Sequence, residues 1–224
     1  MRQEYRCRTK AAVAFATALL LVWPATSVAR FAGSSHRAAA STAPVTVAGD
    51  ASAVRATTLS ALGSLTGLGL TNTTVLSDTG TLAATNDARD AFQTVGTIPS
   101  LLTAEVLSAS TFSYPNQVDS QSSLANLGLS VPGVTIFADS VVAQASQVLG
   151  AAGTASSSIS NLSINGVPVV VSGYPNQSIP IPGGQIVLNE QTISSTGTAV
   201  VNALHLTVTG VADVVVASAT AGIS

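Results

Sequence analysis

From Val45 to the end of the chain, apolar residues alternate with serine, threonine, asparagine or glutamine. A period of two is typical of a strand with one buried and one exposed face. The clearest runs are residues 167–171, 186–188, 204–208 and 214–216. Turn residues separate the runs, and Asn165-Gly166 is the pair that favours a type I′ hairpin turn. The pattern therefore predicts strands throughout residues 45–224.

These strands predict one all-β domain, because no charged or proline-rich linker divides residues 45–224. We predict an antiparallel β-sandwich with at most one or two short helices. The alternative is a β-solenoid, which would repeat every 20 to about 30 residues in many copies. Only one repeat has two good copies, residues 122–129 and 157–164, 35 residues apart. Residues 105–107 match residues 140–142 at the same offset, so we interpret the repeat as a duplicated pair of strands, the two pairs lying side by side over one core.

One short helix is predicted at residues 86–92. Asn86 is a favourable N-cap residue, and Asp87 and Asp90 would lie near the positive end of the helix. The same residues form the densest acidic cluster in the domain. A calcium-binding loop places Asp or Asn at alternate positions, as in Asp-x-Asp-x-Asp, and these residues do not have that spacing, so we expect no metal there.

The first 29 residues have the pattern of a secretory signal peptide. Four of the first ten residues are basic, residues 11–23 are mostly apolar, and Ser27 and Ala29 are small residues at a cleavage position. An uncleaved membrane anchor is the alternative, but a spanning helix needs about 20 apolar residues. We predict a signal peptide at residues 1–29, a flexible spacer at 30–44, and an exported protein with no membrane span after cleavage.

Charge is scarce and mostly acidic in the predicted domain. The chain is 8% charged, against roughly 25% for an ordinary soluble domain. From Ala43 onward two basic residues remain against nine acidic ones, so the net charge is −7. This charge excludes a nucleic-acid surface built on phosphate contacts. The single cysteine, Cys7, belongs to the leader, so a hydrophobic core must stabilise the domain without a disulfide.

His205 is the one histidine of the predicted domain. It alternates with Leu204 and Leu206, so it faces away from the core, and a structural or surface role is expected. No second histidine or cysteine completes a zinc site, and no cofactor signature is present. The enzyme alternative is a secreted hydrolase with a Ser, His205 and Asp arrangement, which requires a serine or aspartate oxygen within hydrogen-bond reach of His205.

A second alternative is a module that binds glycan or ice. It predicts a flat, exposed face of aligned threonine or asparagine side chains, of which residues 207–209 offer one copy. Low aromatic content argues against a sugar hydrolase or a lectin that stacks sugars on aromatic rings. The aromatic residues of the domain are Phe92, Phe112, Tyr114, Phe137 and Tyr174.

A series of short motifs in the C-terminal third resembles the choice-of-anchor P family, exported bacterial proteins seen especially in actinobacteria. The match is most specific over residues 157–223. The residues that carry it are Asn165, Gly166, Pro175, Asn176, Asn189, Glu190, Asn202, His205 and Asp213. The resemblance implies a surface domain and brings no catalytic residues. We therefore expect an exported, non-catalytic protein with a structural, adhesion or matrix role, whose partners are cell-envelope or extracellular-matrix components.

Overall fold

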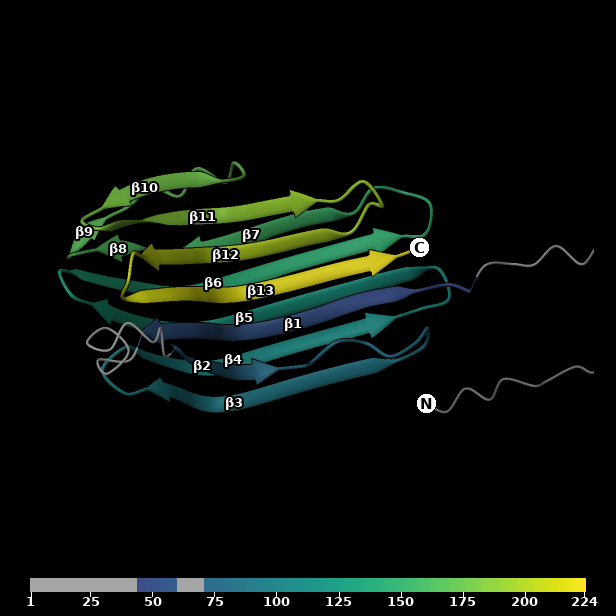
Figure 1. Ribbon diagram of the computed structural model, residues 1–224, viewed down its shortest axis with the longest axis horizontal. Coiled ribbons are helices and arrows are strands. Elements are labelled where there is room, and N and C mark those ends of the chain that lie inside the picture. The colour runs from purple at the N-terminus through teal and green to yellow at the C-terminus, as the bar shows by residue number, and fades with distance from the viewer. Residues whose placement is uncertain (1–43, 60–70) are drawn as a thin grey trace, which may run out of the picture. The chain divides into compact units, whose positions relative to one another are not determined.

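Two antiparallel sheets face each other in the computed structural model, which describes residues 44–59 and 71–224 (Figure 1). These residues belong to one unit of the chain, Ala43–Ser224. The predicted signal peptide and all but the last residue of the predicted spacer lie outside the described residues. The described part contains thirteen strands and no helix, so no helix there is long and apolar enough to cross a membrane.

The first sheet has six strands and the second has seven. In spatial order the first sheet contains β10 (Gln177–Ile181), β11 (Gly184–Ile193), β12 (Ala199–Val208), β13 (Ala212–Ile223), β1 (Val47–Leu59) and β2 (Thr71–Asp78). The second contains β3 (Ala88–Ile98), β4 (Leu102–Ser113), β5 (Gln117–Val131), β6 (Val134–Val148), β8 (Ser163–Ile164) and β9 (Val167–Pro168), and β7 (Thr154–Ser160) also pairs with β6. The predicted antiparallel sandwich is confirmed, and the solenoid alternative is wrong.

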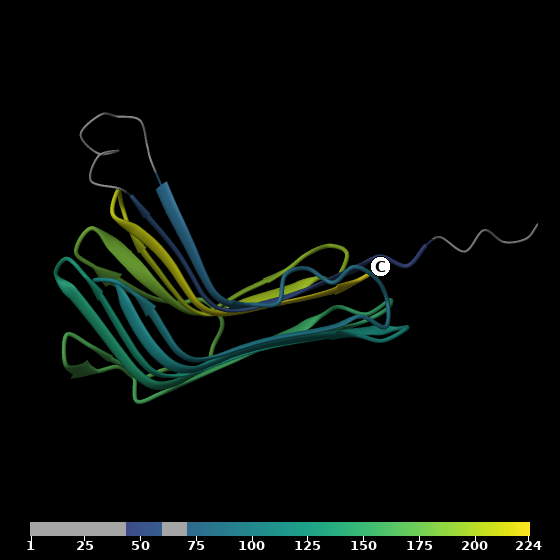
Figure 2. The same ribbon diagram turned by 90° about the horizontal axis from the view of Figure 1, so that it is seen from below.

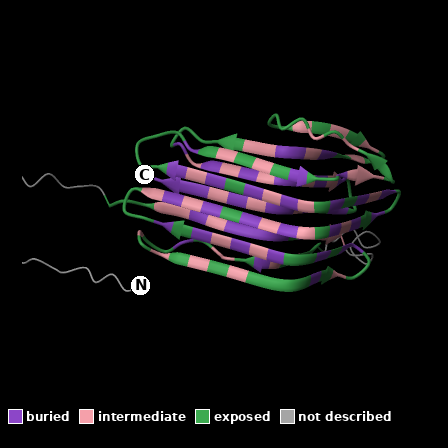
Figure 3. Ribbon diagram, turned by 180° about the vertical axis from the view of Figure 1, so that it is seen from behind, coloured by how far each residue is buried: buried purple, intermediate pink, exposed green. Residues whose placement is uncertain are grey.

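The core between the sheets is built from aliphatic side chains. Buried residues alternate with exposed ones along most strands (Figure 3). Leu188 and Leu204 from the first sheet and Leu107 and Ile136 from the second are fully buried. In contrast, all five aromatic side chains of the described residues are exposed. Buried aromatic side chains usually contribute much of the stability of a core. In this domain the core is stabilised without them, so the exposed aromatic side chains are candidates for contact with a ligand.

Both sheets bend along one line that crosses their strands, which we call the crease (Figure 2). The register of β1 with β13 passes over Ala53 and Ala217, and Val216 and Ala217 are consecutive buried residues. Positive φ angles occur at one level of neighbouring strands, at Ser77, Asn189 and Ala217 in the first sheet and at Val106, Asn126 and Asn161 in the second, and we assign the crease to this level. Neither β1 nor β13 has an extra residue here, because Ser52 pairs with Ser218 and Val54 pairs with Val216. The bend of the whole sheet is therefore accompanied by left-handed backbone at one level of neighbouring strands. The outer face of the first sheet lies inside the bend.

The two copies of the sequence repeat lie on opposite sides of β6 at the same level. Ala143 of β6 pairs with Ser122 on one side and Ser157 on the other. Ile136 likewise pairs with Leu129 and Ile164. The repeat thus marks two strand segments that share β6 as a neighbour and contribute to the same core.

The helix predicted at residues 86–92 is wrong, because β3 begins at Ala88 and continues through this segment. Asn86 has a φ of 63° and belongs to a turn. The carboxylate of Asp87 accepts a hydrogen bond from the Ala83 N–H at 2.9 Å, so it closes the preceding turn and does not cap a helix. Pairing with β4, from Ala88 opposite Phe112 onward, then outweighs local helix preference.

Candidate functional site

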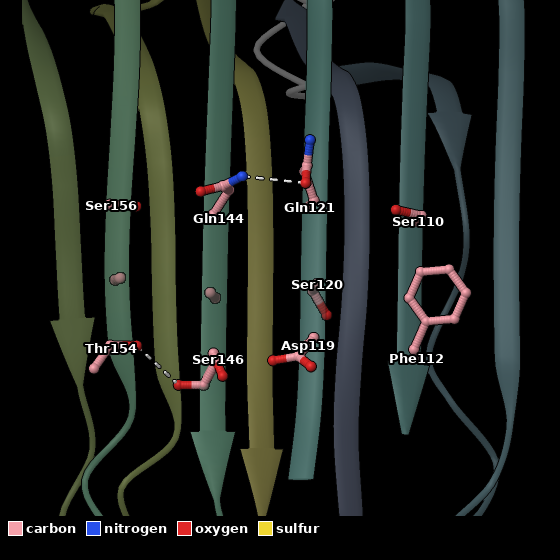
Figure 4. Close-up of a pocket in the computed structure, with 11 residues that line it drawn as sticks. Ser110, Phe112, Asp119, Ser120, Gln121, Gln144, Ser146, Thr154 and Ser156 are labelled. Atoms are coloured by element: carbon pink, nitrogen blue, oxygen red, sulfur yellow. Dashed lines mark hydrogen bonds between the residues drawn. The ribbon is translucent and has the colours of Figure 1, made fainter. Parts of the chain in front are cut away.

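Outward side chains of β4, β5, β6 and β7 form two polar rows across the second sheet (Figure 4). The first row is Ser110, Gln121, Gln144 and Ser156, and the second is Phe112, Asp119, Ser146 and Thr154. Because the register places paired residues on the same face, all eight side chains point to solvent. Strands separated by up to 46 positions in the sequence, from Ser110 to Ser156, thus contribute to one surface.

These two rows enclose an open hollow of about 350 Å³, which we call the sheet-face pocket. The longer side chains of Gln121 and Gln144 lie in the first row and that of Phe112 in the second, and the shorter Ser110 and Ser146 lie beside them (Figure 4). Its volume falls at the lower end of the range for small-molecule sites, about 300 to 1,000 Å³. The pocket therefore suits a small ligand, or one unit of a longer chain.

Hydrogen bonds hold the polar groups of the sheet-face pocket in place. Gln144 Nε2 donates to Gln121 Oε1 at 3.1 Å. Gln117 Nε2 donates to both carboxylate oxygens of Asp119, at 2.9 and 2.8 Å. No hydrogen bond within the described residues uses Gln121 Nε2 or Gln144 Oε1. The pocket thus offers an amide donor, an amide acceptor, one carboxylate and several hydroxyls to a ligand.

Phe112 places an aromatic ring at the border of this pocket, and 41% of the residue is exposed. Phe137 is also exposed on the same face, but its ring lies over Gly128, where an added Cβ would be 3.5 Å from the ring. Phe137 therefore covers a glycine of the neighbouring strand. Phe112 is the aromatic side chain placed to contact a ligand in the pocket.

Sequence reasoning missed the sheet-face pocket. Of its lining residues, only Phe112 is distinctive in the sequence, as one of the few aromatic residues of the domain. The available signal was the serine, threonine or glutamine at every second position of residues 108–110, 144–146 and 154–160. That pattern is common on exposed sheet faces, so it does not by itself indicate a site.

Four residues of the C-terminal motifs converge on the outer face of the first sheet. Glu190 Oε2 accepts a hydrogen bond from Asn202 Nδ2 at 2.7 Å and lies 2.8 Å from His205 Nδ1. His205 Nε2 lies 3.3 Å from Asp213 Oδ1. We call Glu190, Asn202, His205 and Asp213 the histidine network. Their side chains are partly exposed inside the bend of the sheet.

The histidine network brings two carboxylates, and no serine, to the imidazole. The hydrolase hypothesis required a serine or aspartate oxygen near His205, and Asp213 meets that condition. The one hydroxyl hydrogen-bonded to His205 in the described residues is Thr207 Oγ1, at 3.4 Å from the Nε2 that Asp213 also contacts. A histidine that acts as general base needs a ring nitrogen free to accept the proton of its nucleophile. Here the Asp213 carboxylate contacts the same Nε2 as the Thr207 hydroxyl. Among the described residues, no three His, Cys, Asp or Glu side chains are placed to hold a metal ion.

The remaining motif residues have backbone roles. Asn165 and Gly166 form the β8–β9 turn with φ angles of 51° and 76°, as a type I′ turn requires. Asn176, which follows Pro175, accepts a hydrogen bond from the Gln191 N–H at 2.9 Å. Asn189 Nδ2 donates to the Gly173 carbonyl at 3.0 Å. Asn176 and Asn189 thus fix the turn at residues 174–176 against β11, whereas Asn165 Oδ1 accepts from the Thr135 N–H at 2.8 Å. None of these residues joins the histidine network.

An ion pair spans the crease on the same outer face. Arg55 Nη2 lies 3.6 Å from Asp50 Oδ2 and 3.9 Å from Asp78 Oδ1. Asp50 Oδ1 is buried and has no hydrogen-bond partner among the described residues. Burial, followed by the neighbouring Asp78 charge, raises the pKa of Asp50, and the Arg55 charge opposes this shift only in part.

The raised pKa of Asp50 predicts how stability depends on pH. A carboxyl whose pKa is higher in the folded state stabilises the fold below its ordinary pKa of 3.8, and this contribution is lost as pH rises through the folded value. We expect Asp50→Asn to raise the melting temperature at neutral pH and to leave it unchanged near pH 3. Thermal unfolding of both proteins across this pH range measures the difference.

Asp87→Asn is the matched control for Asp50→Asn. The hydrogen bond from Ala83 N–H, with Arg89 beside it, lowers the pKa of Asp87. This carboxylate therefore stabilises the fold above its ordinary pKa, and the stabilisation is lost as pH falls through the lowered value. Asp87→Asn should lower the melting temperature at neutral pH. A lower melting temperature for Asp50→Asn at neutral pH contradicts the assignment.

Comparison with protein-family models, with curated proteins and with solved structures finds no match to this chain.

Proposed function

We propose that this protein is an exported, non-catalytic domain that binds carbohydrate through the sheet-face pocket. The observation that carries the proposal is the exposed ring of Phe112 beside the ordered amides of Gln121 and Gln144. A sugar ring presents an apolar C–H face and hydroxyl groups that both donate and accept hydrogen bonds. An aromatic face with fixed amide and carboxylate groups is complementary to both.

Low aromatic content argues against a lectin that stacks sugars, but the surface positions of the few aromatic residues outweigh it and support carbohydrate over the alternatives. Aromatic residues are few, yet none of those described is used in the core. Ice binding is less well supported, because the rows of the second sheet mix serine with glutamine, aspartate and phenylalanine, so the outward side chains differ in length. Asp119 is the one charged residue that lines the pocket, which favours neutral sugars over uronic acids.

The leader and the geometry of His205 support export without catalysis. Residues 1–29 have signal-peptide anatomy, and both ring nitrogens of His205 face carboxylates. The motif residues 165–213 resemble the choice-of-anchor P family, and we include membership of that family in the proposal. Polysaccharides of a cell envelope or extracellular matrix are then the expected partners.

The proposal predicts that Phe112→Ala abolishes most carbohydrate binding. The purified protein is mixed with insoluble cellulose, chitin or mannan, and the bound fraction is measured over a range of protein concentrations. We expect retention on at least one polysaccharide and a loss of affinity of about tenfold in Phe112→Ala, because stacking on one aromatic side chain contributes about 1 to 3 kcal/mol for a nucleic-acid base, and we expect a sugar ring to fall at the lower end of that range.

Phe137→Ala is the matched control for Phe112→Ala. It removes another exposed ring, 54% exposed against 41% for Phe112, from the same sheet and outside the sheet-face pocket. We expect its binding to equal that of the unaltered protein. If no neutral polysaccharide retains the protein, or if both variants bind as the unaltered protein does, carbohydrate binding at this pocket is wrong.

A further inference from the structure

β7 differs from the other edge strands of the sandwich. An exposed edge is a template for pairing with another chain, and proteins block it with charge, proline, a bulge, a short strand or a covering loop. β10 contains Pro180, β9 contains Pro168, and β3 contains Arg89 and Asp90. β2 ends in Asp78, and its Ser77 has a positive φ of 47°. β7, with the sequence Thr-Ala-Ser-Ser-Ser-Ile-Ser, has none of these features.

The backbone of β7 is paired on one side only. Within the described residues β7 pairs with β6 and with no other strand. A hollow of about 380 Å³ lies at its C-terminal end, lined by both polar and apolar residues, among them Asn161, Ser163, Ile159 and Val171. The strand therefore presents a row of backbone donors and acceptors, next to a mixed surface that a neighbouring strand can cover.

We propose that β7 pairs antiparallel with β7 of a second copy, so that the two second sheets form one continuous sheet. In such a two-fold contact each copy presents the same strand to the other. A charged residue near the centre of the strand would then lie close to the same residue of the second copy, and like charges opposite each other destabilise strand pairing. The described domain has a net charge of −7, from two arginines and nine acidic residues. β7 is an edge of at least seven residues where two copies can meet without a charge on either side.

This pairing has a consequence that rests on the proposed carbohydrate function. Thr154 and Ser156 of β7 line the sheet-face pocket. Joining two copies at β7 therefore places their pockets on the same face, on either side of the shared edge. Two sites on one face increase the affinity for a polymeric sugar by raising the effective concentration of the second site.

Sedimentation of the full chain without carbohydrate tests the pairing independently of the proposed function. We expect a monomer–dimer equilibrium that shifts toward dimer with concentration. The double variant Ser156→Lys/Ser158→Lys places two like charges on exposed positions of the edge. Because like-charge juxtaposition costs several kcal/mol, the dissociation constant should rise by at least about tenfold.

Two further samples make the outcome specific. Thr103→Lys/Ser130→Lys adds the same charge at exposed positions of β4 and β5, away from β7, and should dimerise as the unaltered chain does. An equimolar mixture of Ser156→Lys/Ser158→Lys with Ser156→Glu/Ser158→Glu should dimerise again, which also shows that both variants fold. A monomer at every concentration, or a dimer that the lysines at 156 and 158 leave unchanged, overturns the proposal.

Discussion

Replacing Gln147 with leucine is expected to destabilise the fold by about 3 kcal/mol or more. The side chain is 1% exposed and joins three separate segments. Its Nε2 donates to the carbonyls of Ala151 and Thr196, each at 3.0 Å, and its Oε1 accepts from the Ile223 N–H at 2.9 Å. Leucine has a similar size, so the loss comes from three backbone groups that lose their bond to Gln147. The Ile223 N–H is buried and costs about 1 to 3 kcal/mol when unpaired, and the carbonyls of Ala151 and Thr196, which are exposed residues, each lose a hydrogen bond of about 0.5 to 1.5 kcal/mol.

Urea unfolding of Gln147→Leu, with an unchanged m-value, measures this loss. Gln144→Leu is the control, because Gln144 lies three residues away on the exposed face and bonds only Gln121 in the described residues. Its stability should change by less than about 0.5 kcal/mol. Equal effects at positions 144 and 147 would contradict the role of Gln147 in joining the end of β6 to the β11–β12 turn and to β13.

Gly153→Ala is expected to destabilise the fold by about 2 to 3 kcal/mol, the range of an overpacked site. Gly153 is buried, and its N–H donates to the Gly197 carbonyl at 2.7 Å. A Cβ at this position would lie 2.5 Å from Gly197 O and 2.7 Å from the Ala199 Cβ. Both contacts involve atoms that cannot rotate away, so the two loops must separate.

Gly150→Ala separates this packing effect from the conformational effect of losing a glycine. Gly150 belongs to the same connection, has a φ of 79°, and has open space where a Cβ would lie. Its substitution should cost about 1 kcal/mol, from the left-handed backbone alone. Thermal unfolding of both variants gives the comparison. A smaller loss for Gly153→Ala than for Gly150→Ala would show that the loops do not pack as described.

Local patterns predict most of the strands but miss how the sheets bend. Alternation and the Asn165-Gly166 pair predict a hairpin correctly, because both depend on a few adjacent residues. The error at residues 86–92 arises because Asn86 and Asp87 favour a turn as readily as a helix cap. At the crease the alternation of buried and exposed residues is interrupted, as at Val216 and Ala217, which are consecutive and both buried. The sequence of one strand can show such an interruption. It does not show that neighbouring strands are interrupted at the same level.

The candidate sites depend on register between strands, which the sequence does not encode locally. His205, Glu190, Asn202 and Asp213 each belong to a motif, yet their convergence requires β11, β12 and β13 to pair in one register. The sheet-face pocket requires four strands in register, and its residues resemble those of any exposed sheet face. Phe112 becomes informative only when its polar neighbours across β5 and β6 are known.

Backbone amide shifts during a carbohydrate titration test the central claim most directly. The probe is the soluble oligosaccharide of whichever neutral polysaccharide retains the protein. We predict that the shifts are concentrated at Ser110, Gln121, Gln144 and Ser156, on the outer face of the second sheet. His205 and its neighbours on the opposite face should not change. Shifts centred on the histidine network, or none at saturating oligosaccharide, would contradict carbohydrate binding at the sheet-face pocket.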